Sequence, residues 1–327
     1  MANIVIFAPK FMGYDKKIKA KLIEDGNSVY LFDQRSVKSG IGKAISKKAP
    51  FLLRRKNIKY YKAALDQVLF VPDKILVIQA DLLERPSMDY IKKRWPSVKT
   101  ILYLWDNLSN LKGVKKKVAW FDKAYTFDPI DAQNIKGLDF KPLFFSDDFR
   151  YVPRMDEKPH YDLCSIGTIH SDRYTIISEI AEIAETKEIN FYQFNYLPAK
   201  WLYLFYKLLK KSFKKAHIDE FSFEKKALNE ISKVQKDSKV ILDINHPKQR
   251  GLTMRTIEIM ALGRKMITTN QDIINYDFYN SKNIFIIQRE RIMLPEKEFF
   301  ESEPVLIPEK VRNKYSLNQW LKDVLNI

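Results

Sequence analysis

Residues 243–270, DINHPKQRGLTMRTIEIMALGRKMITTN, place charged and amide side chains between an apolar strand and an apolar helix. Ligands of parallel α/β sheets bind beyond the carboxyl ends of the strands, and a helix N-terminus offers unpaired N–H groups to anions. Gly251, Leu252 and Thr253 would present such N–H groups, and Arg255 would neutralise a phosphate. The segment therefore predicts a site for a phosphate-bearing ligand, with Gln249 among its candidate residues.

Glu258 follows Arg255 by three residues and lies on nearly the same face of the predicted helix. A carboxylate there is well placed to accept both hydroxyls of a ribose. The alternative is a capping interaction with a surface ion pair between Arg255 and Glu258, although Thr253 and Glu258 have the wrong spacing for a capping box.

A second turn, SIGTIHSDR, contains another glycine after a strand. A backbone without a Cβ can approach a ligand closely, and a helix begins near the end of this turn. A simple tight turn is the structural alternative. The candidate ligand contacts of this turn are Gly167, Thr168 and Arg173.

These residues must be positioned by alternating strands and helices, which predict parallel sheets covered by helices. Strands are expected at 4–8, 28–33, 74–80, 100–106 and 123–128, and again at 162–170, 188–194, 239–244, 265–269 and 283–288. Helices are expected near 15–24, 173–186, 221–237, 253–262 and 316–324. The predicted fold class is α/β, with two Rossmann-like domains, 1–150 and 151–312, facing each other across a cleft.

Aspartates end two strands of the first half, in LYLWDN and YTFDPID. A carboxylate at a strand's carboxyl end can accept a proton from a reacting hydroxyl, so Asp106 and Asp128 are candidate catalytic bases, with Asp106 preferred. A helix cap or turn residue is the alternative role. In the first loop, Lys10, Gly13 and Tyr14 are candidates for the same cleft, without a specific spacing.

Several classes of chemistry lack their sequence patterns. The chain has neither G-x-G-x-x-G nor a P-loop, and its four histidines show no metal-ligand spacing, so we expect no nicotinamide, flavin or metal cofactor. The single cysteine, Cys164, lies in a strand-like pattern and is expected to be a buried, inert thiol.

The net charge of +17 predicts an anionic partner. Residues 35–65 hold ten Lys or Arg and no acidic residue, and residues 198–215 interleave six lysines with aromatic and aliphatic side chains. This pattern favours contact with an anionic membrane surface over solvated helix faces or nucleic acid. No apolar run is long enough to span a bilayer and no signal peptide is apparent, so a cytosolic protein is expected. The predicted membrane contacts are Arg54, Arg55, Lys56, Trp201, Phe205, Lys207, Lys210 and Lys211.

The motifs YDLCSIGTIHSDR, FSFEKKALNEISKVQKDSKVILDI and the R-x-x-E junction resemble the donor half of GT-B glycosyltransferases, particularly bacterial enzymes of capsular polysaccharide and lipopolysaccharide assembly. The resemblance covers residues 161–287 and is only architectural for the first 150. It implies a nucleotide sugar as substrate, with Glu258 toward the ribose, Arg255 and residues 251–253 toward the pyrophosphate, and Gly167 near the phosphates. It also implies a final helix, 313–327, that packs back on the first domain.

The leading hypothesis is a metal-independent glycosyltransferase that docks on the inner face of the cell membrane and extends a glycan or lipid-linked glycan. Two alternatives remain: a basic nucleic-acid-binding α/β protein, and a non-catalytic binder of sugar nucleotides.

Overall fold

The computed structural model describes residues 1–37, 50–111, 113–152 and 158–327. Two compact units are present: Met1–Leu143 together with Leu317–Ile327, and Phe144–Ser316. The boundaries therefore fall a few residues from positions 150 and 312. The C-terminal segment belongs to the first unit.

The first unit contains a six-stranded parallel sheet in the order β2-β1-β3-β4-β5-β6. Its strands are β1 (Asn3–Ala8), β2 (Ser28–Asp33), β3 (Lys74–Ile78), β4 (Lys99–Leu104), β5 (Lys123–Thr126) and β6 (Asp139–Phe140). The central strands are runs of Ile, Val and Leu, as expected of strands covered on both faces.

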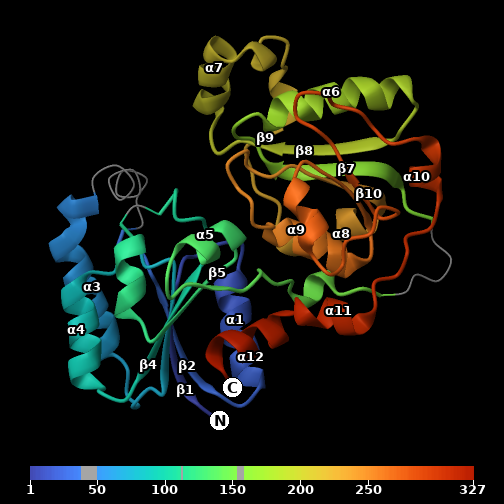
Figure 1. Cartoon of the computed structure of the whole chain (residues 1–327). Coiled ribbons are helices and arrows are strands. Elements are labelled where there is room, and N and C mark those ends of the chain that lie inside the picture. The colour runs from blue at the N-terminus through green and yellow to red at the C-terminus, as the bar shows by residue number, and fades with distance from the viewer. Residues whose placement is uncertain (38–49, 112, 153–157) are drawn as a thin grey trace. The chain divides into compact units, whose positions relative to one another are not determined.

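Helices cover both faces of this sheet (Figure 1). They are α1 (Tyr14–Glu24), α3 (Arg54–Asp66), α4 (Arg85–Arg94), α5 (Pro129–Asn134) and α12 (Leu317–Leu325). On one face, α3 and α4 pack Tyr61, Leu65 and Ile91 against the sheet core. On the other, α12 lies beside α1 and β4 and buries Trp320 completely, with its ring edge against Tyr103 at 4.7 Å.

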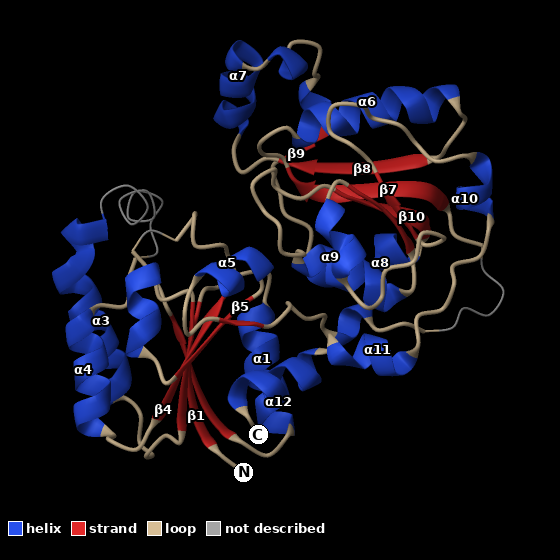
Figure 2. Cartoon of the chain, viewed as in Figure 1, coloured by secondary structure: helices blue, strands red, loops and turns tan. Residues whose placement is uncertain are grey.

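The second unit contains another six-stranded parallel sheet, in the order β12-β11-β10-β7-β8-β9 (Figure 2). Its strands are β7 (Tyr161–Thr168), β8 (Phe191–Tyr196), β9 (Phe221–Ser222), β10 (Ser238–Asp243), β11 (Lys265–Thr268) and β12 (Ile284–Ile286). Its helices are α6 (Arg173–Thr186), α7 (Lys200–Leu209), α8 (Leu228–Lys236), α9 (Met254–Leu262), α10 (Lys297–Glu301) and α11 (Glu309–Lys314).

The strand order of the second unit is that of nucleotide-binding Rossmann sheets, because the chain winds outward from β7 to β9 and then outward on the other side from β10 to β12. The two directions part between β7 and β10, where Cys164 pairs with Ile241. Ligands of such sheets bind at the carboxyl ends of the two strands flanking this switch point.

The expected α/β class with two Rossmann-like domains is confirmed. The expected helix 221–237 is wrong in its first part, because Phe221 is a buried residue of the edge strand β9, against Tyr174 and Phe213. Helix α8 begins only at Leu228, where the Glu230 carboxylate accepts from the Ala227 N–H at 2.6 Å.

Candidate functional site

The segment predicted to bind phosphate lies at the switch point of the second sheet. Gly167 and Thr168 end β7, and the loop after β10 runs to Thr253, the N-cap of α9. The Thr253 hydroxyl accepts from the Thr256 N–H at 3.2 Å, which fixes the start of the helix. The fold thus brings the glycine turn and the R-x-x-E helix together.

Two arginines converge on Gly167. A Cβ added to this glycine would lie 3.0 Å from Nη1 of both Arg173 and Arg255. Because that distance is tighter than ordinary van der Waals contact, any larger residue would push the guanidinium groups away. The glycine therefore allows two guanidinium groups to lie close to the backbone of this turn, and a larger residue would require them to shift by a few tenths of an ångström.

Arg173 clamps the two central strands. Its Nη1 donates to the carbonyl oxygen of Thr168 at 2.8 Å, and its Nη2 donates to that of Ile244. The Nε is buried and has no hydrogen-bond partner in the described part of the chain. Burial and, after it, the charge of Arg255 lower the pKa of Arg173 from its usual value. Direct contact between Arg173 and phosphate stays a prediction.

Arg255 is the less satisfied cation of the pair. It makes no hydrogen bond or close ion pair with any residue that the structure describes, although it is only partly exposed. Burial lowers its pKa, and Asp243 opposes that effect. The Asp243 carboxylate accepts from the Thr256 hydroxyl at 2.5 Å. A partly buried guanidinium without partners is an incomplete site that an anion would complete.

The loop between β10 and α9 is held in one conformation by amide side chains. Asn245 Nδ2 donates to the Gln249 carbonyl at 2.8 Å, and Gln249 Nε2 donates to that of Gly251 at 3.1 Å. Leu252 is only 1% exposed and Gly251 is also buried, so neither residue is open to solvent, and contact of their N–H groups with a ligand stays a prediction. Gln249 likewise supports the loop, and its contact with a ligand stays a prediction.

Glu258 is buried one turn into α9, with 5% of its surface exposed, so it is not part of a surface ion pair. Burial raises the pKa of its carboxyl to about 8. The group is therefore largely protonated at neutral pH, and in that form it can both donate and accept a hydrogen bond.

Two histidines, His170 and His246, lie at the candidate site, although in the sequence the histidines were considered only as metal ligands. His170 follows β7 and His246 follows β10, and their ring centroids are 5.9 Å apart. Burial and the charges of Arg173, His246 and Arg255 lower the pKa of His170 to about 4. Their positions just after the two central strands were the available signal. Within the described ranges, no group of three or more His, Cys, Asp or Glu could hold a metal ion.

Arg289 is a further residue that the sequence pattern did not indicate. It follows β12, and its Nη1 donates to the Asp172 carboxylate at 2.6 Å. Its Nη2 donates to the Asn245 carbonyl at 2.7 Å. Arg289 therefore ties the turn before α6 to the loop after β10 and stabilises both sides of the site.

In the first unit, the two candidate bases differ in their surroundings. Asp128 is 3% exposed and caps α5, because its Oδ1 accepts from the N–H groups of Ile130 at 2.9 Å and Asp131 at 3.2 Å. This is the structural alternative expected for such a residue. Asp106 also makes turn hydrogen bonds, because its Oδ1 accepts from the Asn107 N–H and from Asn110 Nδ2, both at 2.9 Å. Asp106 is partly exposed, however, so it is the more accessible of the two candidate bases.

The first loop offers fewer side chains than expected. Gly13, with φ 81°, is the N-cap of α1, and Lys10 is exposed. Tyr14 is only 2% exposed, so its side chain packs inside the first unit, and a role for it in the cleft stays a prediction.

The predicted membrane contacts divide into two groups. Arg54, Arg55, Lys56, Trp201, Phe205 and Lys211 are exposed. The other two lysines bond to their own domain: Lys207, although exposed, donates from Nζ to the Ala216 carbonyl at 3.0 Å, and the partly buried Lys210 donates from Nζ to that of Ser171 at 2.8 Å. Residues 38–49 of the first basic stretch lie outside the described residues. No described helix is long and apolar enough to cross a membrane.

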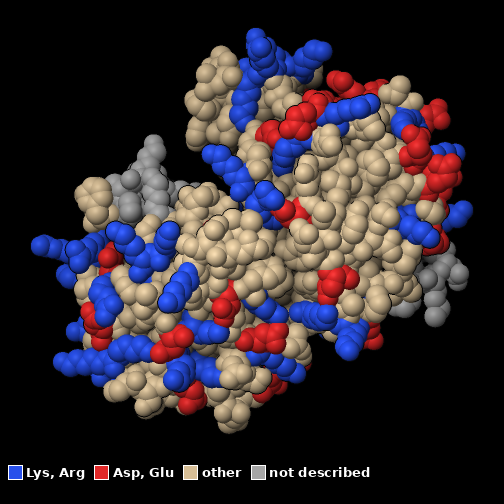
Figure 3. Space-filling view, in the orientation of Figure 1, with Lys and Arg blue, Asp and Glu red and all other residues tan. Residues whose placement is uncertain are grey.

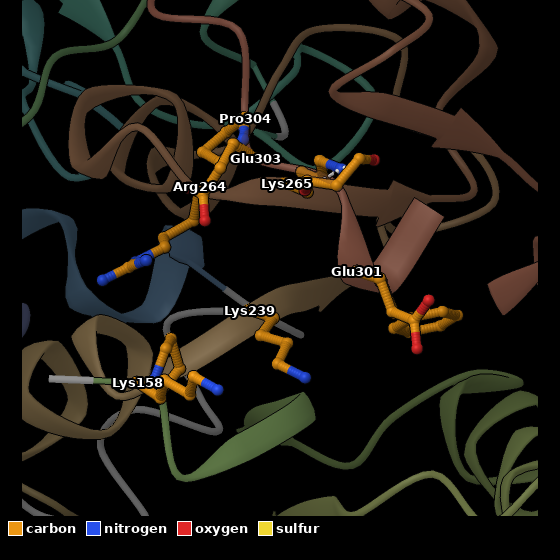
Figure 4. A pocket seen from close by; sticks show the side chains of 10 residues that line it. Lys158, Lys239, Arg264, Lys265, Glu301, Glu303 and Pro304 are labelled. Carbon is orange, nitrogen blue, oxygen red and sulfur yellow. Dashed lines mark hydrogen bonds between the residues drawn. The ribbon is translucent and has the colours of Figure 1, made fainter. Parts of the chain in front are cut away.

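A basic pocket of ≈ 580 Å³ lies at the amino ends of β10 and β11, opposite the switch point (Figure 4). Three of its four cations, Lys239, Arg264 and Lys265, already have partners. Lys239 pairs with Asp162 at 2.6 Å, and Lys265 Nζ donates to the Phe299 carbonyl at 2.8 Å. Two carboxylates, Glu301 and Glu303, also line it. We therefore place the candidate functional site at the switch point.

No protein-family model and no curated protein matches this sequence. Solved structures with the same architecture do match over nearly the whole chain. A glycosyltransferase from Rickettsia africae is 14% identical, with a TM-score of 0.57, covering 99% of this chain and 97% of its own. Anabaena Alr3699/HepE in complex with UDP-glucose is 9% identical, with a TM-score of 0.63, covering 100% and 99%.

Starch synthase IV from Arabidopsis thaliana, bound to ADP and acarbose, is 12% identical through its catalytic domain, with a TM-score of 0.50 and coverage of 100% and 95%. At these identities the likeness concerns the fold alone. The chain has the two-domain α/β architecture of GT-B proteins.

Proposed function

We propose that this protein is a glycosyltransferase that moves a sugar from a nucleotide sugar to a glycan or lipid-linked glycan acceptor. The observation that carries the proposal is Arg255, a partly buried guanidinium at the switch point of a nucleotide-binding type of sheet that has no hydrogen-bond partner among the residues the structure describes. Support also comes from similar folds solved with UDP-glucose and with ADP.

The reaction breaks the bond between the anomeric carbon and the phosphate oxygen and forms a bond to the acceptor oxygen. Arg255 and the N–H groups at the start of α9 stabilise the charge that develops on the departing diphosphate. Gly167 leaves room for the phosphates beside both arginines. Glu258 binds the ribose hydroxyls, and Asp106 accepts the proton of the acceptor hydroxyl. In this scheme the protein residues alone neutralise the leaving group, so transfer proceeds without a metal ion.

We further propose a role in bacterial surface polysaccharide synthesis, at the cytoplasmic face of the membrane. This rests on the resemblance of residues 161–287 to capsular polysaccharide and lipopolysaccharide enzymes and on the basic, aromatic surface. Contact with nucleic acid is not expected.

The test is release of nucleoside diphosphate from UDP-, GDP-, ADP- and dTDP-sugars, and of CMP from CMP-sugars, with glycan and polyprenyl-linked acceptors and with EDTA present. One donor should turn over, and Asp106→Asn should lower kcat about 10²- to 10⁴-fold, as loss of a general base does. Asp128→Asn, which alters a helix cap, should act mainly on stability. Nucleotide binding without turnover of any donor would favour the non-catalytic binder.

A further inference from the structure

Helix α7 carries a continuous apolar face that is open to solvent. Trp201 is 66% exposed, Leu204 58%, Phe205 48% and Leu208 82%. Their spacing of three, four and seven residues places them on one side of the helix. Large exposed apolar patches on soluble proteins mark interaction sites, because their contact with water is unfavourable.

The opposite face of α7 is firmly attached to the second unit. Tyr203 is 4% exposed, its hydroxyl donates to the Ala216 carbonyl at 2.9 Å, and its ring lies 5.5 Å from that of Phe221. Lys207 and Lys210 donate to backbone carbonyls on the same side. The contacts of this buried side therefore hold the apolar face of α7 outward.

The charge around this face identifies the partner. Exposed Lys211, Lys214 and Lys215 follow α7 directly, and residues 198–216 contain no acidic side chain. The space-filling view shows uncharged surface over α7 with basic side chains beside it (Figure 3). Apolar residues flanked by lysines match the boundary between acyl chains and anionic headgroups. A helix of 10 residues is too short to span a bilayer, so it would lie in the interface plane.

We propose that α7 docks this protein on an anionic lipid bilayer, with Trp201, Leu204, Phe205 and Leu208 inserted among the lipids and Lys211, Lys214 and Lys215 at the headgroups. This names the docking element of the proposed glycosyltransferase and the residues that meet the lipid, and it replaces Lys207 and Lys210 of the sequence-based expectation. Docking would hold the donor-binding domain near a lipid-linked acceptor.

The test measures partitioning of the full chain onto phosphatidylcholine vesicles with and without phosphatidylglycerol. The Leu204→Glu/Leu208→Glu variant should bind anionic vesicles at least about ten-fold more weakly, because carboxylates oppose insertion. Replacing Lys211, Lys214 and Lys215 with Gln should cost about five-fold for each lysine at low salt. Leu69→Glu is the matched control, since Leu69 is 90% exposed in the first unit and its change should leave binding unaltered.

The insertion of Trp201 into the bilayer is tested with vesicles of brominated lipids, which should quench the fluorescence of Trp201 in the wild type. A Trp201→Tyr variant should lose that quenching. Unchanged vesicle binding in Leu204→Glu/Leu208→Glu would overturn the proposal. The proposal would also be overturned if the wild type did not bind vesicles and were instead a dimer that the Leu204→Glu/Leu208→Glu variant converts to a monomer. That outcome would identify a second copy of the chain as the partner of α7. Nucleotide binding is measured in the wild type and in the same variants. If none of these proteins, the wild type included, binds a nucleotide, the proposed function is refuted while the docking result stands.

Discussion

Arg255 gains its importance from what surrounds it. The neighbouring Arg173 is committed to two carbonyls, whereas Arg255 is not, and both guanidinium groups lie against Gly167. Two cations held this closely repel each other in the absence of an anion. A diphosphate would relieve that repulsion, which is the physical reason for proposing a phosphate site at this pair.

Glu258 should make stability depend on pH. Its folded pKa of about 8 exceeds its usual value of 4.5, so the folded state holds the proton more tightly than the unfolded state. This contribution is fully present below pH 4.5 and is lost as the pH rises to about 8. The free energy of unfolding of the wild type, relative to Glu258→Gln, should fall by at most about 5 kcal/mol across that range.

Urea unfolding of both proteins at pH 5 and pH 8 checks this expectation. The amide is a control that retains the shape of the side chain and cannot ionise. Equal pH dependence in the two proteins would show that the Glu258 carboxyl is not perturbed by burial.

His170 should couple nucleotide binding to proton uptake. Burial lowers its pKa to about 4, with further lowering by Arg173, His246 and Arg255, and Asp172 opposes the shift. A bound diphosphate adds negative charge beside the imidazole and raises that pKa. Affinity should therefore increase as the pH falls from 8 to 5.

Isothermal titration in two buffers of different ionisation enthalpy measures the protons taken up. The wild type should take up more than His170→Gln, which retains hydrogen-bonding capacity without titrating. The same number of protons in both proteins would place His170 away from the bound phosphates.

Among the elements, α12 is firmly packed onto the first unit. Besides Trp320, it buries Leu321 and Val324, and Lys74 Nζ donates to the carbonyls of Leu325 and Asn326 at its end. Trp320→Ala should lower the free energy of unfolding by about 3–5 kcal/mol, as large core deletions do. Lys322→Ala, on the exposed side of α12, is the control. Guanidinium titrations of the wild type and both variants measure the free energies of unfolding. A loss of less than 1 kcal/mol in Trp320→Ala would mean that α12 is dispensable for the first unit.

Most central elements could be predicted from the sequence, because buried parallel strands are short apolar runs bounded by polar turns. β2 and α6 have the expected bounds, and α9 begins one residue later than expected, after its cap at Thr253. The short edge strand β9 could not be predicted, because Phe221 and Ser222 are defined by packing against a neighbour distant in sequence.

The arrangement of the candidate site could be predicted from the sequence where its signal is local, and could not where it depends on distant segments. The glycine turn and the R-x-x-E helix are contiguous motifs. The clamp of Arg173 on Ile244 and the approach of His170 to His246 depend on the strand order, which places β7 beside β10. No spacing within one segment reports such a pairing.

At the scale of the whole molecule, the net charge of +17 attracts anions over distances greater than any single contact. Both proposed partners, a nucleotide sugar and an anionic bilayer, carry negative charge. Association with each should weaken as salt is added, because the field is screened within about 10 Å at 0.1 M ionic strength. The two interactions use different elements, α9 with the switch-point turns and α7, so variants can separate them.

Titration calorimetry of UDP, GDP, ADP and dTDP against the wild type and Arg255→Met tests the phosphate site directly, at one salt concentration and with matched melting curves. At least one nucleotide should bind the wild type, and Arg255→Met should lose about 10- to 100-fold in affinity, the size of a charge-assisted phosphate contact. Equal affinity in the two proteins, both folded, would contradict the assignment of the phosphate site to Arg255.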